Sequence, residues 1–273
     1  MIPGCISQYV FVDSKIEDAT HVSAPLTNYV FYDVIRIQNG VPLFLEQHTN
    51  RFFRSFVLAG FPYVIQKSEL REALMMFLAH ENLQEGNIRV VYFHDTKPSF
   101  CMYQIAHSYP SVHMYINGVS SDFFYAERKD PNIKQELQVR NLANQEIQRK
   151  QVFDVVYVDE QQMVREGSRT NVFFVHGAKV VTAPAEDVLC GITRGNTIQV
   201  ANDLSIEVQE RKIPLSEISH FDAAFFTGTS PKILPIARIG EYSFATNNTV
   251  VQKLMAAYDQ KIKNYIETYT YSQ

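Results

Sequence analysis

Hydrophobic and polar positions follow two different rhythms along the first third of the chain. Segments 7–12 ("SQYVFV") and 28–37 ("NYVFYDVIRI") are rich in β-branched and aromatic residues, which predicts strands, and "QNG" predicts a tight turn into a further strand. Helical spacing follows over 45–60 and over 67–82, where Ser68 is the expected cap. The first third is therefore expected to begin with a hairpin and continue with two helices.

Two further apolar segments, 87–93 and 100–106, predict strands on either side of the polar turn "HDTKPS". The segment 107–111 ("HSYPS") then reads as a short connection between domains. We accordingly predict a small N-terminal α/β domain over 1–109 and a larger domain over 110–273.

The second part is dominated by strand patterns. It is expected to open with a strand at 112–116 ("VHMYI"), to place Lys134 near the start of a helix, and to contain helices from about Gly191 to Asp203 and from about Asn248. Six more short apolar segments predict strands: "DVVYV", "MVREG", "TNVFFV", "KVVTAP", "IEVQER" and "DAAFFTG". The fold class is therefore α/β in the broad sense, with a strand-rich α+β second domain.

Composition excludes several classes of protein. The chain has 273 residues, of which 46% are hydrophobic and 20% charged, as in folded enzymes and binding proteins. Its net charge of −4, with no basic stripe, argues against nucleic-acid binding. No window reaches the roughly 18 apolar residues of a membrane span, and the N-terminus does not read as a secretory signal.

The three cysteines lie far apart, at Cys5, Cys101 and Cys190, and no CxxC spacing occurs. Neither a disulfide framework nor a zinc site is indicated, so we expect no metal and a cytoplasmic location.

Several polar stretches could carry chemistry. A helix that opens with Ile192 and Thr193 would offer backbone N–H groups and a hydroxyl to an anion such as phosphate; the alternative is that Thr193 only caps the helix. The turn from Thr227 to Ser230 offers further hydroxyls.

His48 and Arg51 are three residues apart, so they share a helix face where Arg51 could bind phosphate and His48 could support it. The alternative is a solvated polar face. Glu166 ends a strand, where a carboxylate can hold the protonated ring nitrogen of a cofactor. Lys134, near the positive end of a helix, could act as a nucleophile once neutral, although most lysines are only solvated surface cations.

The order of these pieces is more specific than any one of them. "DVIRIQNGVPLFLEQHTNRFFRS", "NIK", "REGSRTNVFFV", "LCGITRG", "FFTGTS" and "LPIARI" occur in this order between about Tyr32 and Ile239. Together they resemble the class IV aminotransferases, the fold type IV pyridoxal-phosphate enzymes that include branched-chain and D-amino-acid aminotransferases and aminodeoxychorismate lyases.

The resemblance implies a two-domain subunit, usually in a homodimer, that binds pyridoxal 5′-phosphate. It implies that Lys134 is the Schiff-base lysine and proton carrier and that Glu166 partners the pyridine nitrogen. The phosphate would be held by Arg51, Ile192 N–H, Thr193 and Thr229, and Leu189 would pack against the ring.

Substrate recognition is where the chain departs from these relatives. "HDTKPS" replaces a turn that often carries a carboxylate-binding arginine, and Gln138 or Val139 stands where a tyrosine is frequent. A substrate carboxylate still needs a positive partner, for which Lys232 is one candidate and Arg169, near Glu166, is our preferred one. The predicted substrate-binding residues are Tyr32, Arg36, Arg140, Arg169 and Ser230.

The predicted activity is transfer of an amino group between an amino acid, of branched-chain or D-type, and a 2-oxo acid. Two alternatives remain open. One is a lyase that releases pyruvate and 4-aminobenzoate from aminodeoxychorismate, and the other is a catalytically silent protein that binds the cofactor.

Overall fold

The computed structural model describes residues 2, 4–12, 14–22, 29–63, 65–93, 99–128, 130–134 and 138–271. Most of the predicted polar turn "HDTKPS" lies outside these residues. The chain forms two compact units. Unit 1 comprises Met1–Ser108, Ile133–Glu136 and Ile262–Gln273, and unit 2 comprises Tyr109–Asn132 and Leu137–Lys261.

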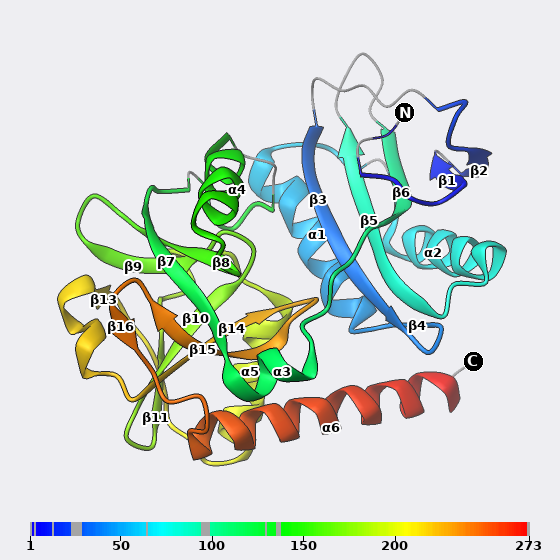
Figure 1. The fold of residues 1–273 in the computed structure, drawn as a ribbon. Helices are drawn as coiled ribbons and strands as arrows, with labels where there is room; N and C mark the ends of the chain where they lie inside the picture. Colours follow the sequence, from blue (N-terminus) through cyan, green and yellow to red (C-terminus); the bar gives the residue numbers. More distant parts are fainter. Residues whose placement is uncertain are drawn as a thin grey trace. The chain divides into compact units, whose positions relative to one another are not determined.

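Unit 1 is built on a six-stranded antiparallel sheet, one face of which is covered by helices α1 (Leu45–Ala59) and α2 (Lys67–Glu81) (Figure 1). Successive side chains of each strand point to opposite faces of the sheet, so the strand sequences decide which residues each face carries. The strands, in sheet order, are β2 (Lys15–Asp18), β1 (Tyr9–Val12), β6 (Ser99–Ile105), β5 (Glu85–Phe93), β3 (Tyr29–Gln38) and β4 (Val41–Pro42).

Strand β3 shows this alternation clearly. Phe31 packs edge-on against the rings of Phe52 and Phe56 of α1, with centroids 5.5 Å and 4.7 Å away. Asp33 follows on the same face, whereas Tyr32 joins the apolar cluster of the opposite face. One strand therefore supplies a buried carboxylate to the helices and a tyrosine to the other side of the sheet.

The ends of the two helices have clear local causes. Helix α1 ends at Gly60, whose φ of 72° is the left-handed conformation that glycine adopts most easily. Helix α2 begins with a capping box between Gln66 and Glu69. The predicted cap at Ser68 is therefore wrong, because Ser68 already lies inside the helix.

Unit 2 contains a ten-stranded mixed sheet with its own apolar core. Most neighbours are antiparallel, but three pairs are parallel: β11 with β12, β15 with β7, and β7 with β8. In sheet order the strands are β12 (Val208–Glu210), β11 (Lys179–Thr182), β10 (Asn171–His176), β14 (Ala223–Gly228), β15 (Lys232–Ile239), β7 (Val119–Tyr125), β8 (Asp154–Val158), β9 (Met163–Gly167) and β13 (Ile213–Pro214), and β16 (Tyr242–Ser243) pairs with β15.

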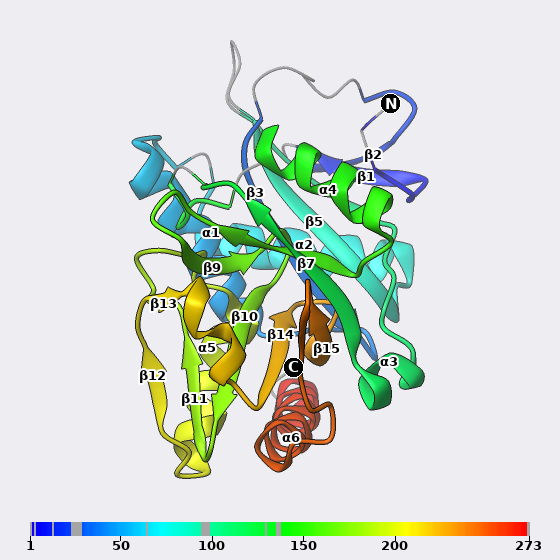
Figure 2. The ribbon, with the colours of Figure 1, turned by 60° about the vertical axis from the view of Figure 1, so that its left-hand side comes forward.

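Helix α5 packs beside β14 and β15, and α4 packs on β7 and β8. Figure 2 shows β12, β11, β10, β14 and β15 next to one another in the sheet. The helical elements of this part of the chain are α3 (Val112–Asn117), α4 (Gln138–Lys150), α5 (Ile192–Asp203), the 3₁₀ helix η1 (Leu215–His220) and α6 (Thr249–Tyr271), which continues into unit 1. Mixed helices and sheets confirm the predicted fold class.

Two predicted elements are wrong. The strand expected at 112–116 is helix α3, because the Ser111 hydroxyl accepts from the Met114 N–H at its start and Gly118, with φ 71°, ends it. Lys134 lies before α4, which begins at Gln138. The helix-dipole argument for its reactivity is therefore not supported, and its setting has to be sought in unit 1.

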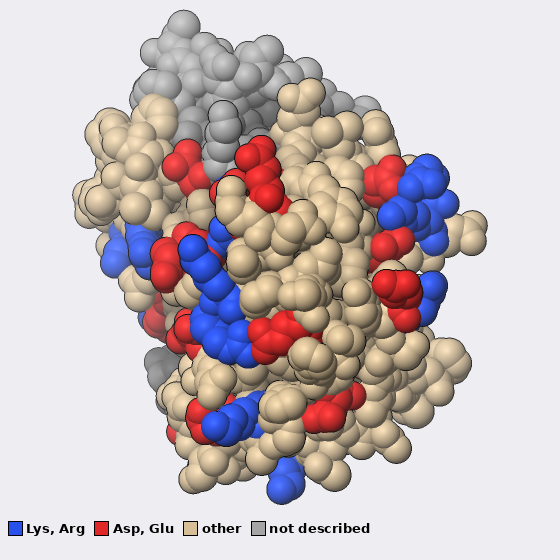
Figure 3. Space-filling model, turned by 90° about the vertical axis from the view of Figure 1, so that its left-hand side faces the viewer, with Lys and Arg blue, Asp and Glu red and all other residues tan. Residues whose placement is uncertain are grey.

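On the face shown in Figure 3, basic and acidic side chains of the described residues lie next to one another rather than in patches of one sign. Within the described part of the chain, no helix combines the length and the apolar character needed to cross a bilayer.

Candidate active site

Arg51 and His48 belong to a buried ionic cluster of unit 1 centred on Asp33. The Asp33 carboxylate accepts hydrogen bonds from Arg51 Nε at 2.8 Å and Arg51 Nη2 at 2.6 Å, and His48 Nδ1 lies 2.8 Å from its Oδ1. All three residues are buried, and Arg51 is only 8% exposed. The alternative of a solvated polar face is therefore wrong, and α1 turns these groups towards β3.

Opposing influences set the charges in this cluster. Burial alone would raise the pKa of Asp33, but Arg51 and His48 outweigh it and hold that pKa well below its usual range. Burial lowers the pKa of His48 despite the nearby carboxylate. The stable arrangement is an ionised Asp33 paired with Arg51 and a neutral His48 that donates its Nδ1–H, which fixes the orientation of the guanidinium.

Lys134 contacts Tyr32 within unit 1. Its Nζ lies 5.4 Å from the centroid of the Tyr32 ring, and its backbone carbonyl accepts from the Tyr32 N–H at 2.9 Å. Arg89 of β5 stacks on the same ring, with its guanidinium carbon 4.2 Å from the centroid. In the register between β3 and β5, Arg89 lies opposite Val34 and Asn87 lies opposite Arg36. The side chains of Arg36 and Arg89 therefore lie on the face of the sheet that carries Tyr32.

Glu166 is a buried carboxylate of unit 2 whose two oxygens are both held by hydrogen bonds. It is 3% exposed, and its Oε1 accepts from Arg128 Nη1 at 2.8 Å. Its Oε2 accepts from Asn171 Nδ2 at 3.1 Å and from the Leu189 N–H at 3.0 Å. Asn171 also donates to the Leu189 carbonyl, so the end of β9, the start of β10 and the segment before α5 are joined.

The turn after Glu166 is organised by Asp154, a fully buried carboxylate of β8. One of its oxygens accepts from the hydroxyl of Ser168 and the other from the hydroxyl of Thr170, at 2.5 Å and 2.8 Å. A Cβ at Gly167 would lie 2.1 Å from Thr170 Oγ1, so only glycine fits there. Arg169, by contrast, is exposed and donates to the Phe153 carbonyl at 2.6 Å.

Helix α5 begins as predicted after Gly191, which caps it without a side-chain hydrogen bond. A Cβ on Gly191 would lie 2.2 Å from Asn171 Oδ1, so glycine lets this loop approach the Glu166 cluster. Thr193 is buried in the first turn but is not the cap, so the alternative that it merely caps the helix is wrong. The first-turn N–H groups and the Thr193 hydroxyl suit an anion.

Thr227 of β14 lies beside Asn171, with which it pairs in register. Its hydroxyl is buried and has no hydrogen-bond partner among the described residues. The predicted residues Thr229 and Ser230 are half-buried in the turn from β14 to β15.

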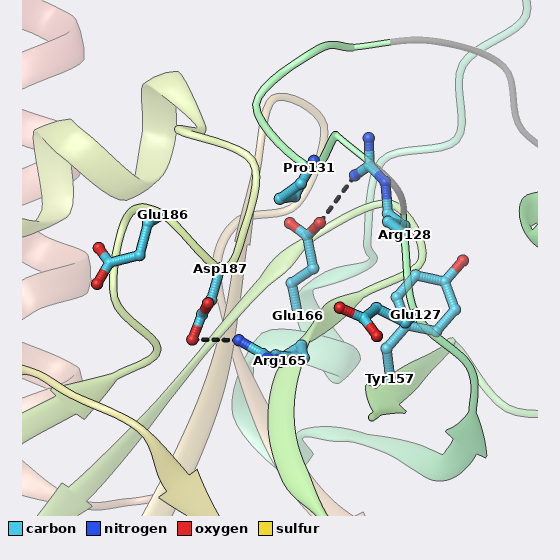
Figure 4. Close-up of a pocket in the computed structure, with 8 residues that line it drawn as sticks. All are labelled: Glu127, Arg128, Pro131, Tyr157, Arg165, Glu166, Glu186 and Asp187. Carbon is cyan, nitrogen blue, oxygen red and sulfur yellow. Dashed lines mark hydrogen bonds and ion pairs between the residues drawn. The ribbon is translucent and has the colours of Figure 1, made fainter. Parts of the chain in front are cut away.

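A cavity of about 100 Å³ adjoins Glu166 (Figure 4). In the close-up the Glu166 carboxylate points to Arg128, and the hydroxyl of Tyr157 is directed away from the Glu166 carboxylate. Arg140 on α4 is half-buried, and burial followed by the charge of Arg169 lowers its pKa. The cavity is lined by Glu127, Arg128, Pro131, Tyr157, Arg165, Glu166, Glu186 and Asp187.

The predicted site residues divide between the units. Unit 1 holds Tyr32, Arg36, Arg51 and Lys134, and unit 2 holds the remaining eight. Those eight are Arg140, Glu166, Arg169, Leu189, Ile192, Thr193, Thr229 and Ser230.

Sequence reasoning missed Asp33, Arg89, Arg128 and Asn171. Asp33 and Arg89 did leave a signal, since each is a charged residue inside an otherwise apolar strand pattern.

The donor set fits pyridoxal phosphate. Such a cofactor needs a lysine, a carboxylate at its ring nitrogen and several donors around its phosphate. Unit 1 contains Lys134, and unit 2 contains the immobilised carboxylate of Glu166. The first turn of α5 offers backbone N–H groups that suit an anion, and the buried Thr227 hydroxyl has no hydrogen-bond partner among the described residues.

Comparisons with known proteins agree with this chemistry. The chain is 27% identical over 252 residues to a probable branched-chain-amino-acid aminotransferase of Rickettsia typhi, covering 87% of this chain and 86% of the relative. It is 23% identical over 281 residues to the aminodeoxychorismate lyase of Bacillus subtilis, covering 94% and 96%.

Among solved structures, a branched-chain aminotransferase of Thermoproteus uzoniensis with norvaline has the same fold, with a TM-score of 0.86 at 23% identity over 96% of this chain and 97% of that one. The model of the family described as amino-transferase class IV matches residues 30–239, which include every predicted site residue. The chain therefore belongs to the class IV aminotransferase family of enzymes.

Proposed function

We propose that this protein is a pyridoxal-phosphate-dependent aminotransferase that exchanges an amino group between a branched-chain or D-type amino acid and a 2-oxo acid. When bound, the cofactor supplies an aldehyde carbon and an electron-poor ring that stabilises negative charge at the substrate's α-carbon. Similarity to proteins named branched-chain aminotransferases favours the branched-chain class.

The setting of Glu166 is the observation that carries the proposal. The cofactor's ring nitrogen must be protonated for the ring to withdraw electrons, and an anionic acceptor held nearby favours the protonated form. Three donors, from Arg128, Asn171 and the Leu189 backbone, fix the Glu166 carboxylate before any ligand arrives. A buried carboxylate fixed in this way is a pre-organised partner for a pyridinium.

Lys134 would hold the cofactor through its aldehyde and afterwards carry the proton between the substrate's α-carbon and the cofactor carbon. Its contact with Tyr32 supports this role, because the backbone bond and the ring restrict where its Nζ can lie. A lysine on a free surface would lose more entropy in reaching a reactive position.

The phosphate would be bound by Arg51, the Ile192 N–H, Thr193 and Thr229, with Thr227 as an added donor. The hydrogen bonds of Arg51 to described residues use Nε and Nη2. Its Nη1 would then serve a phosphate oxygen, and Asp33 would keep the fork in position.

Arg89 is a stronger candidate for a substrate carboxylate than Arg169. Arg89 and Lys134 contact the same Tyr32 ring, whereas the guanidinium of Arg169 is engaged by the Phe153 carbonyl. Arg36, on the same sheet face, would add a second positive charge. Tyr32 would then form the floor on which the substrate lies.

A half-reaction tests the proposal. The purified holoenzyme is mixed with a panel of L- and D-amino acids, and the absorbance change from the aldehyde to the amine form of the cofactor is recorded. We expect branched-chain substrates to react fastest and Lys134→Ala to abolish the change, while Lys253→Ala, at an exposed position of α6, leaves it intact. If wild-type protein binds the cofactor and no amino acid converts it, the aminotransferase proposal fails.

The lyase alternative is supported by the similarity to aminodeoxychorismate lyase over nearly the whole chain. It would use the same lysine and carboxylate but release pyruvate. Incubation with aminodeoxychorismate, followed by a pyruvate assay, separates the two activities. A protein that is inactive in both assays would be the catalytically silent cofactor-binding alternative. The homodimer that the resemblance implies and the cytoplasmic location that the cysteine pattern indicates stay predictions.

A further inference from the structure

The side chain of Asn132 closes a loop of unit 2 that runs from Ala185 to Cys190. Its Nδ2 donates to the Ala185 carbonyl at 3.2 Å, and its Oδ1 accepts from the Cys190 thiol at 2.9 Å. The Cys190 sulfur also lies 3.7 Å from the Ala185 carbonyl oxygen. The donor and the acceptor of one amide group therefore hold the two ends of the loop together.

This loop carries a hydrogen-bond donor of the proposed cofactor site. The Leu189 N–H donates to Glu166 Oε2 at 3.0 Å, and the Leu189 carbonyl accepts from Asn171 Nδ2 at 2.9 Å. The loop lies between β11 and α5 and belongs to no helix or strand. Its backbone therefore depends on individual hydrogen bonds, rather than on a sheet or a helix, to keep the Leu189 N–H in place.

Helix capping does not explain the position of Asn132, because α4 begins only at Gln138. Asn132 is also not a freely solvated amide, since it is half-buried and both ends of its side chain bond within unit 2. It is the last residue of unit 2 before the chain enters unit 1 at Ile133, and Lys134 follows directly after Ile133. The same clamp thus fixes the point from which the chain runs to the lysine proposed to hold the cofactor.

The position of the Leu189 N–H matters because Glu166 is the proposed partner of the cofactor's protonated ring nitrogen. A carboxylate that is already oriented by fixed donors needs no rearrangement when the ring arrives. Even a misplacement of about 1 Å in a supporting segment can lower a rate on the order of a hundredfold. Glu166 would keep Arg128 and Asn171 if the clamp were lost, so its orientation should be disturbed rather than abolished.

We propose that Asn132 is a positioning residue of the cofactor site, which clamps the loop from Ala185 to Cys190 so that the Leu189 N–H stays on Glu166. This inference rests on the proposed function. Asn132 acts through Leu189 and Glu166 rather than by contact with the cofactor.

Hydrogen exchange in the apoenzyme tests the clamp without any measurement of activity. Asn132→Ala removes both hydrogen bonds, and we expect the Leu189 amide to exchange about tenfold faster than in wild type. Cys190→Ser keeps a donor to Asn132, so exchange should stay within about twofold of wild type, whereas Cys190→Ala should exchange about threefold faster. Asn141→Ala, at an exposed position of α4, is the matched control and should leave the exchange rate unchanged.

The half-reaction with L-leucine measures the consequence for the chemistry. At saturating leucine, the Asn132→Ala holoenzyme should convert the aldehyde form of the cofactor to the amine form about tenfold more slowly than wild type. The leucine concentration at half-saturation should change by less than about twofold, because Asn132 does not bind the substrate. Cys190→Ser and Asn141→Ala should react at nearly the wild-type rate.

Several outcomes would overturn the inference. Wild-type exchange of the Leu189 amide in Asn132→Ala would show that the side chain does not hold the loop. A lower melting temperature of this variant, with wild-type exchange and rate, would mean that Asn132 only stabilises the fold. Equal behaviour of Cys190→Ser and Cys190→Ala would exclude the hydrogen bond to Asn132 as the cause.

Failure of the proposed function gives a different result. If wild type binds the cofactor and no amino acid converts it, the proposed function fails, and the role of Asn132 in that reaction fails with it. If wild type reacts and Asn132→Ala matches it in both exchange and rate, only the inference about Asn132 fails.

Discussion

Each unit buries a carboxylate beside residues of the proposed site, and the two units stabilise it by different means. Asp33 of unit 1 is held by the charged fork of Arg51 together with His48. Asp154 of unit 2 is held by the hydroxyls of Ser168 and Thr170 and by backbone N–H groups. The first arrangement joins opposite charges, and the second surrounds one charge with dipoles.

The difference has consequences for what each carboxylate can organise. An arginine fork fixes the direction of one long side chain, as the proposed role of Arg51 in binding phosphate would require. A ring of hydroxyl and N–H donors instead fixes backbone, and Asp154 thereby shapes the turn that follows Glu166. Loss of Asp33 would leave a buried positive charge, whereas loss of Asp154 would leave neutral donors unsatisfied.

The largest effect is expected for Asp33→Asn. The amide keeps the shape of the side chain but removes the charge opposite Arg51, which is 8% exposed. Breaking a buried ion pair in this way costs about 3–5 kcal/mol. The free energy of unfolding from urea titration measures this loss. Asp222→Asn, at an exposed carboxylate that accepts from the Gly177 N–H, is the control and should cost less than about 1 kcal/mol.

Asp154→Asn is expected to lower the free energy of unfolding by less than Asp33→Asn does, by about 1–3 kcal/mol. The oxygen of the new amide can still accept hydrogen bonds, whereas its nitrogen faces groups that are themselves donors. The same urea titration compares it directly with Asp33→Asn. Equal losses in the two variants would contradict the distinction between a charge pair and a set of dipoles. The turn after Glu166 should loosen as well, which hydrogen exchange at the Ser168 and Arg169 amides would detect.

The charged cluster should also make stability depend on pH. The pKa of His48 is lowered from 6.5 in the folded state, so unfolded chains bind a proton first and stability falls as pH drops below about 6.5. The slope cannot exceed about 1.4 kcal/mol per pH unit for one proton. Below about pH 4, protonation of Asp33 in the unfolded chain adds to the loss, since its folded pKa is lowered too.

His48→Asn isolates this effect, because the amide can still donate to Asp33 but does not titrate. Between about pH 6.5 and 5, the free energy of unfolding of the variant should not show the fall with decreasing pH that His48 causes in wild type. An unchanged slope would mean that His48 is protonated in the folded protein and that the cluster carries an extra positive charge.

Much of the fold follows from the sequence because long periodic patterns decide it. The apolar alternation of β3 and the helical spacing of α1 and α5 lead to the observed elements. The segment 112–116 misleads because its alternation is that of a strand, while Ser111 and Gly118 act as local start and stop signals for one short helix. Short segments are decided by their ends rather than by their pattern.

The local setting of a candidate residue could be predicted where a motif in its own segment indicates it, but not where contacts between distant segments create it. Glu166 at a strand end and Thr193 at a helix start were both found from local context. Asp33 and Arg89 acquire roles only when β3 and β5 pair and α1 packs on them. Lys134 was singled out by the order of motifs along the chain, and its role stays a prediction. Its position before α4 shows that the supposed helix start does not explain that role.

The smallest effect separates two buried threonines of unit 2 and sharpens the account of Asp154. Thr170 Oγ1 donates to Asp154, whereas the Thr227 hydroxyl has no partner among the described residues. Thr170→Val should therefore destabilise the apoenzyme by about 1–2 kcal/mol, and Thr227→Val by about 0.5 kcal/mol or less. Thermal and urea unfolding of the two apoenzyme variants measure this difference in stability. The order of the two variants should reverse for their effect on cofactor binding. Thr227→Val removes a proposed donor to the phosphate, so it should weaken binding of the cofactor severalfold. If Thr227→Val instead destabilises the apoenzyme as much as Thr170→Val, its hydroxyl is already satisfied inside the fold and contributes nothing to the phosphate.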